Sequence, residues 1–180
     1  LNFVEGDLDG ALQESIRQVG FSAGDKNVAV HFHPGNASLR MPADWSRIQR
    51  TCVNLLENAI RFSPEGGIIH IRAGIKNGNG LNRYLVVAIE DQGIGIEPDK
   101  QSLVFEKFYT SDRRSRAERR GVGLGLTFSK MAVEAHGGNI WVESPYVDRC
   151  GREVRGCSFR FRIPAPPNSE IPVTTEQRYE

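Results

Sequence analysis

"NLLENAIRFSPEGG" (residues 54–67) joins the end of an amphipathic helix to a turn, and asparagine interrupts its helix-forming run twice. Asparagine prefers caps and turns, yet Asn54 and Asn58 are spaced so that they share one helix face. A carboxamide oxygen can bind a hard cation such as Mg²⁺ without adding negative charge beside phosphates. A solvent-facing polar stripe is the alternative interpretation of the same two residues.

The apolar pattern around this stretch predicts a domain of mixed helices and strands. Helical spacing predicts helices over residues 8–19, from the cap at 44 to 63, and over 123–138. Alternating or continuous apolar runs predict strands at residues 27–32, 38–42, 66–75, 83–90, 139–144 and 157–163. Because helices and strands do not alternate strictly, we expect a layer of helices over one face of a mixed sheet.

Size and charge are those of a single globular domain. The chain has 180 residues and a net charge of +1, so no bulk charge favours nucleic acid or an anionic membrane. No apolar run approaches the ~18 residues that cross a bilayer, and no signal peptide is visible. The chain opens at Leu1 and not at Met, so we expect a fragment of a longer protein. We expect residues 1–165 to form one domain and the proline-rich residues 166–180 to be an extended or disordered tail.

Three further segments carry residues suited to a phosphate-bearing ligand. In "EDQGIGI" (90–96), Asp91 follows a strand, where its carboxylate could accept a hydrogen bond from an adenine amino group. In "GVGLGLTFSK" (121–130), glycines open a helix whose free N–H groups favour anions. "SDRRSRAERRG" (111–121) is basic enough to act as a mobile lid over a polyphosphate. Taken singly, a plain turn, a glycine-rich helix start and a solvated loop explain the three segments equally well.

The order and spacing of these segments resemble the catalytic and ATP-binding domain of sensor histidine kinases, within the gyrase–chaperone–kinase–MutL ATPase superfamily. The matching motifs are "NLLENAIRFSP" (54–64) for the N box, "DQGIGI" (91–96) for the first glycine box, "FEKFY" (105–109) for the F box and "GVGLGL" (121–126) for the second. "HGGNIWVES" (136–144) and "GCSFRFRIP" (156–164) resemble the closing strands. The resemblance covers roughly residues 7–164. It implies a Bergerat-type α/β fold, an α+β two-layer sandwich with about five strands in a mixed, largely antiparallel sheet and three main helices on one face.

The resemblance also implies ATP and Mg²⁺ as cofactors and a role for each matched residue. Asn58 matches the Mg²⁺ ligand, Asp91 the acid that reads adenine, and Arg61 a basic residue that reaches the phosphates. The implied catalytic positions are Asn54, Asn58 and Lys107. The implied nucleotide-binding positions are Asn54, Asn58, Arg61, Phe62, Asp91, Gly93, Gly95, Ile96, Lys107, Phe108, Gly121, Val122, Gly123, Leu124, Gly125 and Leu126, with residues 110–120 as the ATP lid. Phe62 stands where tyrosine is common and Cys157 near a position that is often Ser or Thr, and both departures could weaken nucleotide binding.

Position 54 bears on the type of reaction. In hydrolytic members of the superfamily a glutamate there activates water, whereas the carboxamide of Asn54 is a poor general base. Glu57 is a less natural base for the same pocket, because it lies about 100° around the helix from Asn58. The sequence therefore favours transfer of the γ-phosphoryl group over hydrolysis. The family's acceptor is a histidine followed by an acid on an upstream dimerization domain, and none of the four histidines of this chain fits that pattern.

We therefore expect two partners, the kinase's own dimerization domain and a response-regulator receiver domain, and no nucleic acid. We expect the isolated domain to be monomeric and its location to be cytoplasmic, including the cytoplasmic part of a membrane-anchored sensor. The alternatives are a hydrolytic ATPase of the same superfamily, a degenerate module that works as a docking surface, and a serine kinase acting on an anti-sigma-type partner. Two smaller alternatives also stay open: metal binding by His31 and His33, and a disulfide between Cys150 and Cys157 in place of reduced cysteines.

Overall fold

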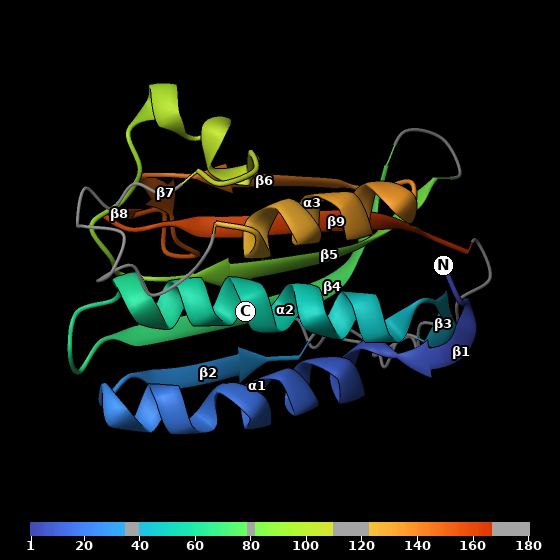
Figure 1. The fold of residues 1–180 in the computed structure, drawn as a ribbon, viewed down its shortest axis with the longest axis horizontal. Helices are drawn as coiled ribbons and strands as arrows, with labels where there is room; N and C mark the ends of the chain where they lie inside the picture. The colour runs from blue at the N-terminus through green and yellow to red at the C-terminus, as the bar shows by residue number, and fades with distance from the viewer. Residues whose placement is uncertain (35–39, 79–81, 110–122, 167–180) are drawn as a thin grey trace, which may run out of the picture.

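Three helices lie over one face of a five-stranded sheet in the computed structural model (Figure 1), which describes residues 1–34, 40–78, 82–109 and 123–166. The helices are α1 (Leu8–Asp25), α2 (Trp45–Phe62) and α3 (Gly125–Ala135). The sheet consists of β2 (Ala29–His33), β4 (Ile68–Asn77), β5 (Arg83–Glu90), β6 (Asn139–Glu143) and β9 (Ser158–Ala165). Two short 3₁₀ helices, η1 (Pro98–Lys100) and η2 (Leu103–Phe105), follow β5.

The sheet is mixed because one strand runs parallel to its neighbour. The strand order is β2-β4-β5-β9-β6, with β2 parallel to β4 and every other pair antiparallel. The connection from β2 to β4 passes through α2, which is the crossover that a parallel pair requires. The expected sandwich, with about five strands and three main helices on one face, is confirmed.

Helix α2 lies at the centre of the helical layer and carries both Asn54 and Asn58. Its expected cap, Asp44, accepts a hydrogen bond from the backbone N–H of Arg47 at 3.2 Å. Its apolar face is fully buried against the sheet, and it includes Leu55, Leu56 and Ala59. Replacing a buried leucine of this kind by alanine typically lowers the free energy of unfolding by about 2–5 kcal/mol, which is a large fraction of a domain's stability. The apolar spacing thus fixes which face of α2 remains for polar residues.

Two small sheets lie outside the main one. Strand β1 (Val4–Asp7) pairs antiparallel with β3 (Arg40–Ala43), which is the strand expected near residues 38–42. Strands β7 (Tyr146–Val147) and β8 (Glu153–Val154) form a short hairpin between β6 and β9. Residues 35–39, residues 79–81, the expected lid at 110–120 and residues 167–180 of the expected tail lie outside the described residues.

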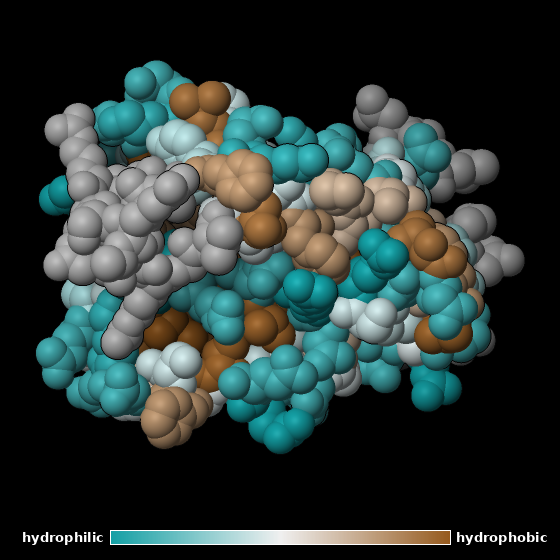
Figure 2. Space-filling model, viewed as in Figure 1, coloured by the Kyte–Doolittle hydropathy of each residue, from teal (hydrophilic) through white to brown (hydrophobic). Residues whose placement is uncertain are grey.

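The surface agrees with the two-layer arrangement. Figure 2 shows hydrophilic side chains over much of α1 and α2, with apolar side chains in the seam between the two helices. Among the described residues, no helix combines the length and apolarity needed to span a bilayer.

Candidate functional site

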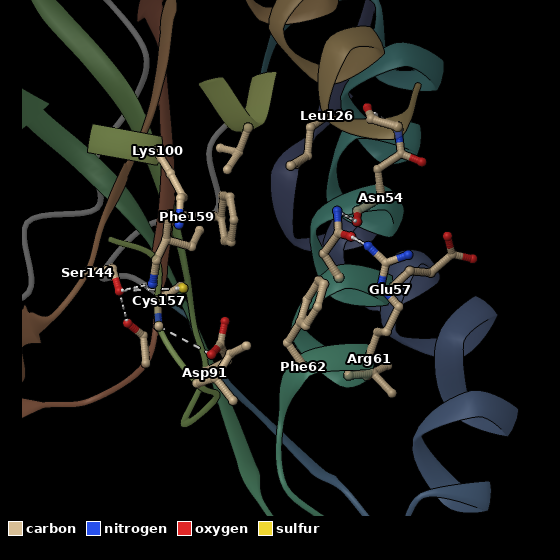
Figure 3. A pocket seen from close by; sticks show the side chains of 18 of the residues that line it. Asn54, Glu57, Arg61, Phe62, Asp91, Lys100, Leu126, Ser144, Cys157 and Phe159 are labelled. Atoms are coloured by element: carbon tan, nitrogen blue, oxygen red, sulfur yellow. Dashed lines mark hydrogen bonds between the residues drawn. The ribbon is translucent and has the colours of Figure 1, made fainter. Parts of the chain in front are cut away.

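A cavity of about 1500 Å³ opens between α2 and the sheet at the end of β5 (Figure 3). Its walls come from α2, the loop after β5, the first turn of α3 and the start of β9, so segments far apart in the sequence meet there. Ten of the expected nucleotide-binding residues line it: Asn54, Asn58, Arg61, Phe62, Asp91, Gly95, Ile96, Gly123, Gly125 and Leu126.

Asp91 lies on the sheet side of the cavity and is 2% exposed. Its Oδ1 accepts hydrogen bonds from the backbone N–H groups of Gly93 at 2.8 Å and of Cys157 at 3.2 Å. Burial raises the pKa of this carboxyl from 3.8 to about 6, and the two hydrogen bonds oppose that rise. Figure 3 shows the carboxyl group pointing into the cavity. A buried carboxylate held by its own backbone is a directional acceptor for a ligand N–H group.

Two glycines allow the backbone to pack tightly around Asp91. A Cβ on Gly93 would lie 2.8 Å from both Asp91 Oδ1 and the carbonyl oxygen of Phe62. A Cβ on Gly156 would lie 2.0 Å from the carbonyl oxygen of Asp91. The first glycine box predicts a role for Gly93 at the site, whereas no motif predicts one for Gly156, which precedes a closing strand. Both positions require glycine because a backbone atom occupies the space of a side chain.

The opposite wall is the polar face of α2. Asn58 donates from Nδ2 to the carbonyl oxygen of Asn54 at 3.0 Å, and its Oδ1 accepts a hydrogen bond from Arg61 Nη2 at 2.7 Å. The Arg61 guanidinium also lies 4.6 Å from the centre of the Phe62 ring. A single carboxamide oxygen on a cavity wall fits Mg²⁺, which takes one or two protein oxygens together with waters and substrate phosphates. If Asn58 Oδ1 held such an ion, the guanidinium of Arg61 would have to move away, because both are positively charged.

Glu57 also lines the cavity, although its position on the helix made it a less natural base. The side chain is exposed, and Figure 3 shows it pointing outwards from α2, away from Asp91. Lys26, which follows α1, lines the cavity as well and donates from Nζ to the carbonyl oxygens of Ile60 at 2.9 Å and Arg61 at 2.6 Å. No sequence motif pointed to Lys26, because its partners are backbone atoms of a helix distant in the chain.

Two residues that the sequence did not single out hold the loop after β5 in place. Ser144 lines the cavity, and Gln101 contacts Ser144. Ser144 Oγ accepts a hydrogen bond from the backbone N–H of Ile96 at 2.8 Å and donates to the carbonyl oxygen of Gly156 at 2.6 Å. Gln101 Nε2 donates to the carbonyl oxygens of Ile96 at 3.1 Å and Ser144 at 2.6 Å. Together they tie the loop after β5 to the loop before β9. Cys157 lies beside them, and burial raises the pKa of its thiol to about 12.

Four expected site residues that the structure describes do not line the large cavity, and one of them, Gly93, donates its backbone N–H to Asp91. Lys107 lines a shallow pocket of about 320 Å³ between the F box and α3, and not the large cavity. Phe108 and Leu124 are 68% and 44% exposed and do not line the large cavity. Gly121 and Val122 lie outside the described residues.

The histidines and cysteines left two alternatives open. His33 Nε2 lies 3.0 Å from Nδ1 of His70, a partner on the neighbouring strand that the sequence did not predict. Among the described residues, no group of three or more His, Cys, Asp or Glu side chains has an arrangement suited to a metal ion. Cys150 and Cys157 are both free, so the structure contains no disulfide between them.

Comparison with known proteins places these features in a family. Residues 43–167 match the model described as "Histidine kinase-, DNA gyrase B-, and HSP90-like ATPase". The sensor histidine kinase WalK of Bacillus subtilis is 33% identical over 132 residues, which are 73% of this chain but only 20% of WalK. The solved mycobacterial sensor histidine kinase MprB has a TM-score of 0.74 at 26% identity, covering 92% of this chain and 99% of that chain. The histidine kinase ThkA, solved in complex with the response regulator TrrA, has a TM-score of 0.68 at 26% identity, covering 93% of this chain and 43% of that chain.

Proposed function

The chain belongs to the histidine kinase-, DNA gyrase B- and HSP90-like ATPase family, as a domain of the sensor histidine kinase type. We propose that it is the catalytic domain of such a kinase and acts as follows. The domain binds Mg-ATP in the cavity between α2 and the sheet. It then transfers the γ-phosphoryl group to a histidine on a dimerization domain that this chain does not contain. Since the chain spans about a fifth of the length of WalK, the activity of the whole protein is part of the proposal.

One observation carries the proposal: a buried carboxylate faces a large cavity whose opposite wall holds two asparagines. Asp91 is positioned by Gly93 and Cys157 and can accept a hydrogen bond from the amino group of adenine. Phe62 lines the cavity on the other side, where its ring can pack against the nucleotide. The base is therefore recognised by one directional polar contact in a largely apolar site, as is usual for cofactor pockets.

The phosphates would lie along the polar face of α2. Arg61 can exchange the Asn58 oxygen for a phosphate oxygen, since a guanidinium binds an anion more strongly than a neutral carboxamide. That exchange frees Asn58 Oδ1 to hold Mg²⁺. When bound, the ion neutralises charge on the phosphates. Positioning and charge stabilisation of this kind supply most of the catalysis in phosphoryl transfer.

Transfer is favoured over hydrolysis because of what Asn54 does. Its side chain is a carboxamide, which has no atom basic enough to activate water, and its Nδ2 donates to the carbonyl oxygen of Gly125 at 3.0 Å. The outward direction of Glu57 supports the same conclusion. A hydrolytic ATPase remains the second candidate, because Glu57 does line the cavity.

The proposed partners follow from the reaction. ThkA was solved with the response regulator TrrA, which supports a receiver domain as the final phosphoryl acceptor for this chain too. The histidine that accepts the γ-phosphoryl group would be supplied by a dimerization domain. Since that domain makes the dimer contacts, we expect the isolated chain to be monomeric. Free cysteines are consistent with the reducing cytoplasm as the place where this domain works.

Calorimetric titration of the non-hydrolysable ATP analogue AMPPNP with Mg²⁺ tests the nucleotide site. Asp91→Asn should weaken binding at least about tenfold, because the amide presents both donors and acceptors where only an acceptor fits. Asp99→Asn, at an exposed position that does not line the cavity, is the matched control and should bind like the wild type. Failure of the folded wild type to bind would favour the degenerate docking module.

Labelling with ATP that carries a radioactive γ-phosphate tests the transfer step. The longer kinase that contains this chain should acquire an acid-labile, base-stable phosphohistidine. Release of inorganic phosphate without a labelled protein would instead support the hydrolytic ATPase.

A further inference from the structure

Ser129 is fully buried on the side of α3 that faces α2. Its Oγ donates to the carbonyl oxygen of Gly125, one helical turn earlier, at 3.0 Å and lies 3.4 Å from Nδ2 of Asn54 on α2. Asn54 Nδ2 also donates to that same carbonyl oxygen, at 3.0 Å. Three groups from two helices therefore meet at the first turn of α3.

Other contacts hold the rest of α3 against α2. The Arg50 guanidinium lies 4.3 Å from the centre of the Phe128 ring. At the far end, His136 Nε2 accepts a hydrogen bond from the backbone N–H of Asp44 at 3.0 Å. Of these contacts, only the one at Gly125 involves residues that line the cavity. Loss of Ser129 should therefore loosen the cavity end of α3 while the remainder of the helix stays in place.

We propose that Ser129 is a positioning residue for the terminal phosphate of the nucleotide. It acts together with Asn54 by fixing the backbone of Gly125 at the cavity wall. The inference rests on the proposed function. The backbone N–H groups of the first helical turn are unpaired within the helix and attract anions, so a small displacement of this turn weakens a phosphate contact. Asp91 lies on the sheet and shares no hydrogen bond with this cluster, so binding of the base should not change.

The test compares AMPPNP with ADP, which lacks the terminal phosphate. Calorimetry in the presence of Mg²⁺ measures both dissociation constants for the wild type and for Ser129→Ala. We expect AMPPNP to bind on the order of fivefold more weakly to the variant, which corresponds to the loss of one hydrogen bond, and ADP to change by less than about twofold. A purely structural role would weaken both ligands equally.

Ser15→Ala is a matched control, because Ser15 is equally buried and makes the same kind of contact. Its Oγ donates to the carbonyl oxygen of Ala11 at 2.7 Å and to that of Gln49 on α2 at 3.3 Å, but neither Ala11 nor Gln49 lines the cavity, whereas Gly125 does. We expect Ser15→Ala to leave the ratio of the two dissociation constants unchanged. Ser129→Cys, which keeps a weaker donor in nearly the same volume, should give an intermediate ratio and can replace the alanine variant if that one does not fold.

The Asn54→Ala background tests whether the two side chains act as one unit. There, Ser129→Ala should alter the ratio less than it does in the wild-type background, because the contact between Ser129 and Asn54 is already lost and only the bond from Ser129 to Gly125 remains to be removed. An unchanged ratio in Ser129→Ala and Ser129→Cys, or an equal change in Ser15→Ala, overturns the inference while the proposed function stands. Absence of AMPPNP binding by the wild type overturns the proposed function, and the inference with it.

Discussion

At the scale of single residues, the carboxyl group of Asp91 is under two opposing influences. Burial favours its neutral form, whereas the N–H groups of Gly93 and Cys157 favour the charged form. Burial is the stronger influence and raises the pKa of the carboxyl group to about 6. The group is therefore mostly ionised at pH 7 and mostly neutral at pH 5. The carboxylate that we propose as the acceptor for adenine is therefore present at neutral pH at a cost to the stability of the free protein.

Stability and nucleotide affinity should consequently respond to pH in opposite directions. The folded-state pKa of about 6 lies above the ordinary value of 3.8, so the folded protein binds more protons than the unfolded chain between these limits. The Asp91 contribution to the free energy of unfolding is therefore lost as pH rises from about 4 to 6, by up to about 3 kcal/mol. Chemical denaturation across this range should show that Asp91→Asn removes this part of the slope.

Affinity of the wild type for AMPPNP should increase as pH rises through about 6, because an ionised carboxylate accepts the hydrogen bond of the adenine amino group more strongly than the neutral acid does. Calorimetry at pH 5 and pH 7 measures the change. An affinity that is independent of pH would mean that Asp91 does not contact the base.

At the scale of elements, the last turn of α2 is held by a side chain from another segment. Lys26 Nζ donates to the carbonyl oxygens of Ile60 and Arg61, two of the carbonyls that the end of a helix leaves unpaired. This turn carries Arg61 and leads into Phe62, both on the cavity wall. The position of Arg61 on the cavity wall thus depends on Lys26, which belongs to none of the sequence motifs.

Replacing Lys26 by methionine should keep most of the packing and remove both hydrogen bonds. We expect the free energy of unfolding to decrease by about 1 kcal/mol, and the amides of the last turn of α2 to exchange faster with solvent. Thermal denaturation and hydrogen-exchange measurements test the two effects. Lys26→Arg, which retains donors, should restore much of the protection, and equal exchange rates in Lys26→Met and the wild type would contradict the tether.

The loop between β8 and β9 presents a different constraint. Gly156→Ala would place a methyl group 2.0 Å from the carbonyl oxygen of Asp91, so β9 or the Asp91 loop must move. We expect a loss of about 3 kcal/mol of stability, measured by chemical denaturation, together with weaker AMPPNP binding.

Gly20→Ala is the contrasting control for this substitution. No atom lies within 4 Å of the added methyl group, and Gly20 is in the interior of α1. This variant should be more stable than the wild type by roughly 0.5–1 kcal/mol. A stabilised Gly156→Ala would show that the loop can yield without cost.

At the scale of the whole molecule, β2 is one of the two edge strands of the sheet and, within the part of the chain that the structure describes, has β4 as its single neighbour. His33 on β2 and His70 on β4 lie with ring nitrogens 3.0 Å apart, a contact in which one ring must be neutral. Burial lowers the pKa of both imidazoles, and nearby positive charge on Arg72 lowers it further. The other charged or titratable groups that act on one or both rings are His31, Arg149 and Glu90.

Acidification should therefore destabilise the fold through this pair. Because the folded-state pKa values lie below 6.5, the unfolded chain binds more protons than the folded protein as pH falls through that value. The stabilising contribution is present above pH 6.5 and is lost below it. Thermal denaturation of His70→Gln at pH 5 and pH 7.5 should show a smaller pH effect than the wild type. Equal pH effects in the wild type and in His70→Gln would refute the role of the pair.

Local patterns were sufficient for the elements and for much of the cavity. The apolar face of α2 follows from its spacing, and its start follows from Asp44, because helix formation and capping depend on neighbours in the chain. Asn58 and Asp91 lie on facing walls of one cavity, as the motif order implied. The inferences about α2 needed only residues that are close in the sequence. The inference about Asn58 and Asp91 came from motifs whose arrangement in the fold is known for the family.

The contacts that complete the site were decided by the tertiary structure alone. Lys26 and Gly156 contact backbone carbonyl groups of other segments, and every residue type carries such a carbonyl, so the sequence does not reveal these contacts. Ser129 contacts the side chain of Asn54 on α2, and this contact depends on how the two helices pack. The same reason hid the pairing of His33 with His70, which depends on the register between β2 and β4. The sequence by itself determined which side chains are available for chemistry. Only the packing of α2, α3 and the sheet determined how they are held, because that packing selects which distant backbone groups come within hydrogen-bonding distance.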